Sequence, residues 1–137
     1  MKGVLIDAGP LVGLLHEDDQ HHDPCVRSLA DLRDPLWTVW PAVTEAACLL
    51  SEVSPRSPDR LMELLESGTV GLLPLSSEDL PRIRALMLKY RDLPMDLADA
   101  ALVCAAEREG ITTVFTTDQR HFRIYRPSHA RSFAIIP

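Results

Sequence analysis

The stretch that decides the fold is "GVLIDAGPLVGLL", residues 3–15, in which one carboxylate follows a short apolar run. Val4, Leu5 and Ile6 are continuously apolar, which is typical of a strand covered on both faces in a parallel sheet. Asp7 ends this strand, and Gly9-Pro10 is interpreted as a break before a helix. We therefore expect an α/β protein with a charged side chain at the carboxyl end of its first strand.

The rest of the chain repeats this alternation of strand and helix. Further strands are expected at 36–40, 70–75, 111–117 and 133–137, and helices at 21–33, 41–53, 59–67, 76–90 and 96–109. Gly71 and Pro74 favour an edge position for the strand at 70–75. Such alternation predicts a three-layer α/β/α sandwich with a mostly parallel central sheet, in a single domain spanning residues 1–137.

Composition and charge limit the class of protein. Hydrophobic residues make up 46% of the chain and charged residues 25%, as in an ordinary globular protein. The formal net charge of −6 argues against a broad basic surface for nucleic acid, but not against an enzyme that meets nucleic acid through metal ions.

The apolar runs and the cysteines indicate the cellular compartment in which the protein is expected. No apolar run approaches the roughly 20 residues that a membrane span needs, so a cytoplasmic protein without a membrane partner is expected. Cys25, Cys48 and Cys104 are odd in number and form no CxxC pair, which favours buried, reduced thiols.

Carboxylates recur where the predicted strands and helices begin or end. Asp7 and Asp118 follow strands, Glu45 lies near the start of helix 41–53, and Asp96 and Asp99 lie at the start of helix 96–109. In parallel α/β sheets ligands bind beyond the carboxyl ends of the strands, so these acids are site candidates. Ordinary alternatives exist. Asp96 is better explained as a helix N-cap, and Asp118 is explained equally well as a cap or as a site residue. For Glu45, a solvated first-turn acid is an open alternative.

Asp7 and Asp99 are harder to explain by local structure, because their neighbours are apolar and buried charge is costly unless it is paired or bound to a metal. Carboxylates with no histidine or cysteine at equivalent positions favour Mg²⁺, or Mn²⁺ as the alternative ion, over zinc. Such a cluster suits phosphoryl chemistry with metal-activated water. Dehalogenase-type phosphatases, receiver domains and P-loop proteins are disfavoured, because their second aspartate or their lysine is missing.

Four motifs in order resemble the PIN-domain family, and within it the VapC-type toxins of toxin–antitoxin pairs. They are "LIDAGPLVGLL" at 5–15, "VTEAACLL" at 43–50, "DLPMDLADAALVCAAEREG" at 92–110 and "TTDQRHF" at 116–122. The resemblance implies a Mg²⁺-dependent endoribonuclease that hydrolyses RNA, is inhibited by a small VapB-like antitoxin and forms a homodimer. It also implies an acidic catalytic set, with Asp7 and Asp99 as metal ligands, made up of Asp7, Glu45, Asp99 and Asp118.

Other residues receive supporting roles from the same resemblance. Asp96 and Asp92 are expected to support the acidic set. Many relatives carry Thr or Ser near the first acid, where this chain has Ala8 and Gly9, so Thr117 is the candidate to supply a hydroxyl.

The only dense basic stretch lies between residues 120 and 131 and is a candidate for contact with RNA phosphates, through Arg120, Arg123 and Arg126 in particular. A solvated loop or an antitoxin-facing surface explains it equally well. For dimerisation, an exposed face with Leu61, Leu64 and Leu65 is the candidate. Two alternative functions stay open at this point: a non-catalytic PIN-like binding module, and a PIN-type nuclease that acts on DNA.

Overall fold

The fold is built around β1 (Val4–Ile6), all of whose residues are buried. The computed structural model describes residues 2–137. β1 pairs in parallel with β2 (Leu36–Thr38) and β4 (Thr113–Phe115), while β3 (Val70–Leu72) and β5 (Ala134–Ile136) extend the sheet on either side. The order β3-β2-β1-β4-β5 places β3 at an edge, as predicted. Within residues 2–137 every strand pair is parallel, so the predicted sheet is confirmed.

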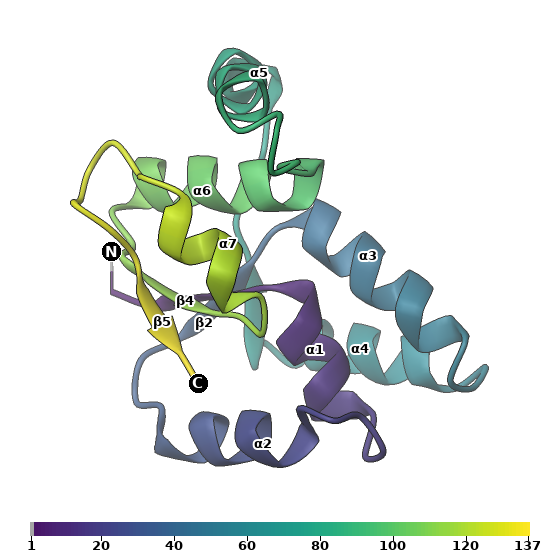
Figure 1. The fold of residues 1–137 in the computed structure, drawn as a ribbon. Coiled ribbons are helices and arrows are strands. Elements are labelled where there is room, and N and C mark those ends of the chain that lie inside the picture. The colour runs from purple at the N-terminus through teal and green to yellow at the C-terminus, as the bar shows by residue number, and fades with distance from the viewer. Residues whose placement is uncertain (1) are drawn as a thin grey trace.

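Helices cover both faces of this sheet (Figure 1). Val4 and Ile6 pack on one face with α1 (Ala8–Leu15), α2 (His22–Asp31) and α4 (Ser57–Glu66). Leu5 packs on the other face with α5 (Leu80–Lys89), α6 (Leu97–Glu109) and α7 (Gln119–Ile124). α3 (Trp40–Ser51) contacts α1 and α4 as well as α6. The predicted three-layer α/β/α sandwich is thus confirmed.

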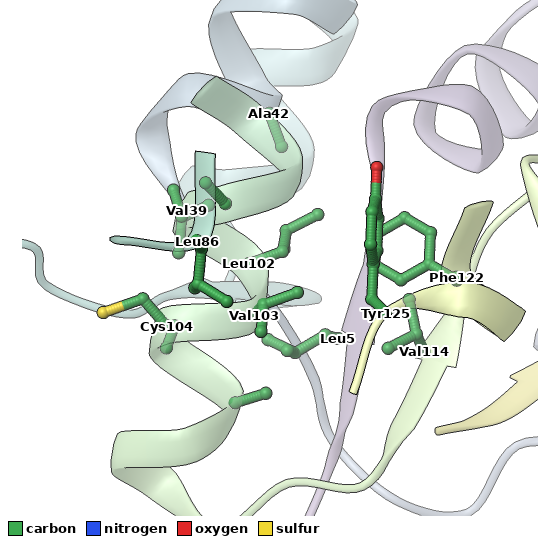
Figure 2. Close-up of a cluster of buried hydrophobic side chains, with 14 of the residues drawn as sticks. Leu5, Val39, Ala42, Leu86, Leu102, Val103, Cys104, Val114, Phe122 and Tyr125 are labelled. Atoms are coloured by element: carbon green, nitrogen blue, oxygen red, sulfur yellow. The ribbon is translucent and has the colours of Figure 1, made fainter. Parts of the chain in front are cut away.

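α6 is the most deeply buried helix, and its sequence explains why. Every residue from Ala98 to Ala106 is buried, and five of those nine positions are alanines, which let α5 and α3 approach the helix closely. Figure 2 shows Leu102 and Val103 of α6 facing Leu5 and Val114 of the sheet. α6 ends at Gly110, whose φ of 71° is the left-handed conformation that glycine adopts most easily. The burial of this helix fixes where its first turn, with Asp99, must lie.

The Gly9-Pro10 pair is not a break between strand and helix, which corrects the prediction. α1 begins at Ala8, directly after Asp7, so both residues lie in its first turn. Pro10 is tolerated there because its missing N–H would have no partner within the helix. A Cβ atom on Gly9 would lie only 2.2 Å from Oγ1 of Thr117. The glycine therefore permits close approach between α1 and the segment after β4.

Three further expectations differ from the structure. Leu61 is fully buried and Leu64 and Leu65 pack against the same core, so the proposed leucine dimer face is wrong. Cys25 and Cys104 are buried as expected, but Cys48 is exposed. The short helix α7 was not predicted, and a 3₁₀ turn, η1 (Ser77–Asp79), precedes α5. In the described part of the chain, no helix is long and apolar enough to cross a membrane.

Candidate metal centre

A hollow of about 250 Å³ lies beyond the carboxyl ends of β1 and β4, where the strand order reverses. All four acids of the predicted set line it, and they are joined there by Asp96, Thr117 and His121. Asp92 is exposed and is not among the residues that line the hollow. Residues far apart in the sequence therefore meet at one edge of the sheet: Asp7, Glu45, Asp99 and Asp118.

Asp7 is held at the junction of β1 and α1. Its Oδ1 accepts a hydrogen bond from the N–H of Ala8 at 2.7 Å, and its Oδ2 accepts one from the Thr116 hydroxyl at 3.0 Å. Burial raises the pKa of Asp7 to about 6, although these two hydrogen bonds favour the ionised form. The carboxylate is thus fixed in orientation, yet its charge is incompletely compensated.

Thr116 connects the ends of the two central strands. Besides donating to Asp7, its Oγ1 accepts a hydrogen bond from the N–H of Asp118 at 3.0 Å. Its own N–H donates to the carbonyl oxygen of Ile136, the last residue of β5, at 2.8 Å. The Thr116 side chain is completely buried, and its hydroxyl both donates and accepts a hydrogen bond. It therefore sets the relative position of Asp7 and Asp118.

Asp99 enters the hollow from the first turn of α6. Its N–H donates to Oδ1 of Asp96 at 2.8 Å, so Asp96 caps the helix as predicted. Its Oδ2 accepts a hydrogen bond from the Tyr125 hydroxyl at 2.7 Å. Burial, and then the negative charge of Asp7, raise the pKa of Asp99 to about 8, whereas the Tyr125 hydrogen bond lowers it. Figure 2 shows the Tyr125 oxygen pointing out of the apolar cluster.

Asp118 serves both as a helix cap and as a residue of the hollow, so its two interpretations are compatible. It accepts a hydrogen bond from the N–H of His121 at 3.4 Å at the start of α7. Its Oδ2 also lies 2.7 Å from Nδ1 of His121. Across the hollow, burial and the negative charges of Asp7, Asp96 and Asp118 raise the pKa of Glu45, which lies on α3.

Sequence reasoning missed Thr116 and Tyr125 and misjudged His121. Thr116 was one of several β-branched residues in "ITTVFTT", and a single buried aromatic is usually core. His121 was counted with the basic stretch, and the expectation that no histidine accompanies the acids is wrong. The position of His121 three residues after Asp118 could have predicted its place in the site, because this spacing puts both side chains on one side of a helical turn.

The donor set fits a divalent cation. One ligand atom from each of Asp99, Asp118 and His121 lies within 4.8 Å of the others. Of the described residues that line the hollow, none is a lysine or an arginine. Several carboxylates in one place resist ionising together, and a cation removes that penalty. Asp7 is not part of this three-residue group, although it lies in the same hollow.

The three arginines predicted to contact RNA lie outside the hollow. All are exposed. Arg123 donates to the Gln119 side chain at 3.2 Å, and Arg126 donates to the carbonyl oxygens of Arg123 and Tyr125. Arg120 lies on α7, one residue before His121. Arg123 lies on the same helix, and Arg126 follows its end.

A parallel α/β/α sandwich whose carboxyl edge carries an acidic, cation-fitting hollow defines a class of metal-site proteins. Within that class, this chain belongs to the PIN-domain family, because the family model "PIN domain" matches residues 4–127. It is 33% identical to Ribonuclease VapC26 of Mycobacterium tuberculosis (strain ATCC 25618 / H37Rv) over 73 residues, covering 53% of this chain and 54% of that protein. The match therefore spans about half the length of the curated relative.

The fold is also similar to a solved structure. The crystal structure of Mycobacterium tuberculosis VapC20, described as a sarcin–ricin loop cleaving toxin, superimposes with a TM-score of 0.75 and 14% sequence identity. The similarity covers 81% of this chain and 86% of that one. At this identity the likeness supports the fold, including the parallel sheet and its helical layers.

Proposed function

We propose that this protein is a VapC-type endoribonuclease, dependent on a divalent cation such as Mg²⁺, and the toxin of a toxin–antitoxin pair. The observation that carries the proposal is the meeting of Asp7, Glu45, Asp99 and Asp118 in one hollow that a cation fits. A relative named as a ribonuclease supports the choice of RNA over DNA, and a structural neighbour described as a sarcin–ricin loop cleaving toxin supports the role of a toxin.

The residues in and around the hollow have different roles in the proposed hydrolysis of a phosphodiester bond. When bound, the cation supplies Lewis acidity that activates water and offsets the charge of the phosphodiester. Asp7, Asp99 and Asp118 would supply carboxylate oxygens to it. Thr116 and Tyr125 hold the carboxylates of Asp7 and Asp99 in a fixed orientation. Glu45, whose pKa is raised, is placed to accept a proton from the attacking water at its carboxylate.

Cleavage of a structured RNA panel tests the proposal. Full-length protein, purified without antitoxin, is assayed with Mg²⁺, with Mn²⁺ and with EDTA, beside single-stranded and duplex DNA. We expect metal-dependent RNA cleavage that Asp99→Asn abolishes and Asp92→Asn preserves, because Asp92 is an exposed acid outside the hollow. Protein that folds and binds metal but cuts nothing supports the binding-module alternative, and preferential cutting of DNA supports the DNA nuclease.

We further propose a homodimer and a VapB-like antitoxin as partners, on the strength of an apolar surface beside the hollow. One groove beside the hollow is lined by three exposed apolar side chains, Trp40 (51% exposed), Leu49 (44%) and Leu97 (52%). Leu97 also lines a second groove, together with Leu80 and Leu88. Trp40→Glu and Leu97→Glu are expected to convert a dimer into a monomer, as measured by light scattering. A monomeric parent protein would refute the dimer.

A further inference from the structure

The geometry points to His121 as a ligand of the cation, alongside Asp99 and Asp118, and to Mn²⁺ as the ion that this centre binds more tightly than Mg²⁺. This inference rests on the proposed metal-dependent function and adds a nitrogen donor to it. It was not expected from the sequence, which assigned His121 to a basic surface.

The first argument is spacing. His121 and Asp118 are three residues apart at the start of α7, and Nδ1 of His121 lies 2.7 Å from Oδ2 of Asp118. Adjacent ligands of one octahedral ion with bonds of about 2.1 Å are about 3 Å apart, and opposite ligands about 4.2 Å. The ligand atoms of Asp99, Asp118 and His121 already lie within 4.8 Å of one another, so these side chains need to move together only slightly to bind one ion. An acid and a histidine at i and i+3 also bind one metal together in helical carboxylate centres.

The second argument is that packing keeps the imidazole at the hollow. The His121 ring stacks on Tyr125, with centroids 6.3 Å apart and an interplanar angle of 24°. Tyr125 is fully buried, and its hydroxyl binds Asp99. One buried side chain therefore orients both the imidazole and the carboxylate. The His121 side chain retains 28% exposure, which leaves the ring accessible to an ion from solvent.

The choice of ion follows from donor chemistry. Mg²⁺ prefers oxygen ligands and gives up its water reluctantly. Of the two ions considered for this centre, only Mn²⁺ is a transition metal, and it accepts carboxylate oxygens while tolerating an imidazole nitrogen better than Mg²⁺ does. An imidazole added to the carboxylates of the hollow thus shifts the preference from Mg²⁺ toward Mn²⁺. The competing explanation is that His121 only pairs with Asp118 and never contacts the ion. In that case, removing the imidazole would not change the ratio of the Mn²⁺ and Mg²⁺ affinities.

Pulsed electron paramagnetic resonance on the full chain loaded with Mn²⁺ alone tests the inference. We expect a ¹⁴N coupling typical of a bound imidazole, replaced by a ¹⁵N coupling in protein labelled with [¹⁵N]histidine. The coupling should disappear in His121→Ala and persist in His16→Gln, a control histidine outside the hollow. Labelled wild-type protein shows whether a histidine binds the ion even if His121→Ala does not fold, and His121→Asn is a second variant that assigns the coupling to His121.

Titration calorimetry provides the second measurement. His121→Ala should weaken Mn²⁺ binding by at least about tenfold, the scale typical of lost metal-site partners, and Mg²⁺ binding by less than about threefold. Mn²⁺ bound without nitrogen coupling, coupling that survives in His121→Ala, or no Mn²⁺ binding would each overturn the inference. RNA cleavage by the same samples separates the two proposals: cleavage without coupling refutes only the histidine ligand, and coupling without cleavage refutes only the nuclease.

Discussion

Replacing Tyr125 by phenylalanine removes one hydroxyl and leaves the buried ring in place. That hydroxyl donates to Oδ2 of Asp99 at 2.7 Å, while the ring packs against Tyr90 and Phe122 with centroids 5.1 Å away in each case. A hydrogen bond to a charged group contributes about 1.5–3 kcal/mol. This corresponds to about 10- to 100-fold in a binding constant, which is also the usual effect of removing a group that orients a metal ligand.

The loss should appear in metal binding and in its pH dependence. A cation competes with a proton for Asp99, whose pKa is already raised to about 8, and the hydroxyl is one of the groups that lower it. Tyr125→Phe therefore raises the pKa of Asp99 further. We expect calorimetry at pH 7 to show about 10- to 100-fold weaker Mn²⁺ and Mg²⁺ binding, and the pH at which binding is half-maximal to rise.

Tyr90→Phe is the matched control. The Tyr90 hydroxyl accepts a hydrogen bond from the N–H of Arg126 at 2.9 Å, in the same aromatic cluster but without a bond to a carboxylate. Its removal should change stability without changing metal affinity. If Tyr125→Phe binds metal within twofold of the wild type, or if its pH dependence is unchanged, the hydroxyl does not control Asp99.

Three other perturbations have defined outcomes. Because burial raises the pKa of Asp99 from 3.8 to about 8, the metal-free protein loses stability as pH rises through this range. Asp99→Asn should then raise the Tm at pH 7 in EDTA by roughly 4 °C or more and have no such effect at pH 4, as differential scanning calorimetry can show. Gly9→Ala should cost about 1–3 kcal/mol in urea unfolding, because its Cβ meets Thr117, and the added change Thr117→Ala should restore most of it. Arg120→Glu with Arg123→Glu should weaken RNA binding and flatten its salt dependence while leaving Mn²⁺ affinity unchanged; equal RNA affinity in a filter-binding assay would rule out this surface.

The fold was predictable from features local to the sequence, and the set of four acids from these features together with the resemblance to the PIN-domain family. Short continuous apolar runs are typical of parallel strands, and parallel strands end at the same edge of the sheet. A carboxylate that follows such a run therefore lies at the edge where ligands bind. Asp7 and Asp118 therefore had to approach each other once β1 and β4 paired as neighbours. The cap at Asp96 was likewise readable from its position before a helix.

The partners of the acids were not predictable, because they depend on contacts across the fold. Tyr125 reaches Asp99 only after α7 packs against α6, and in the sequence it looks like any core aromatic. Thr116 lies 109 positions from Asp7 and gains its role from strand pairing. Gly9 was misjudged for the same reason, since its close neighbour Thr117 belongs to a distant segment.

The bond from Thr116 to the carbonyl of Ile136 gives the site an order of assembly during synthesis. A ribosome releases Asp7 and Asp99 first, yet the hydroxyl groups that bind their carboxylates belong to Thr116 and Tyr125, later in the chain. The backbone of Thr116 is itself secured by the segment around β5. A nascent chain thus carries most of its acidic residues without an organised centre, and that centre forms only after the later part of the chain has emerged and docked.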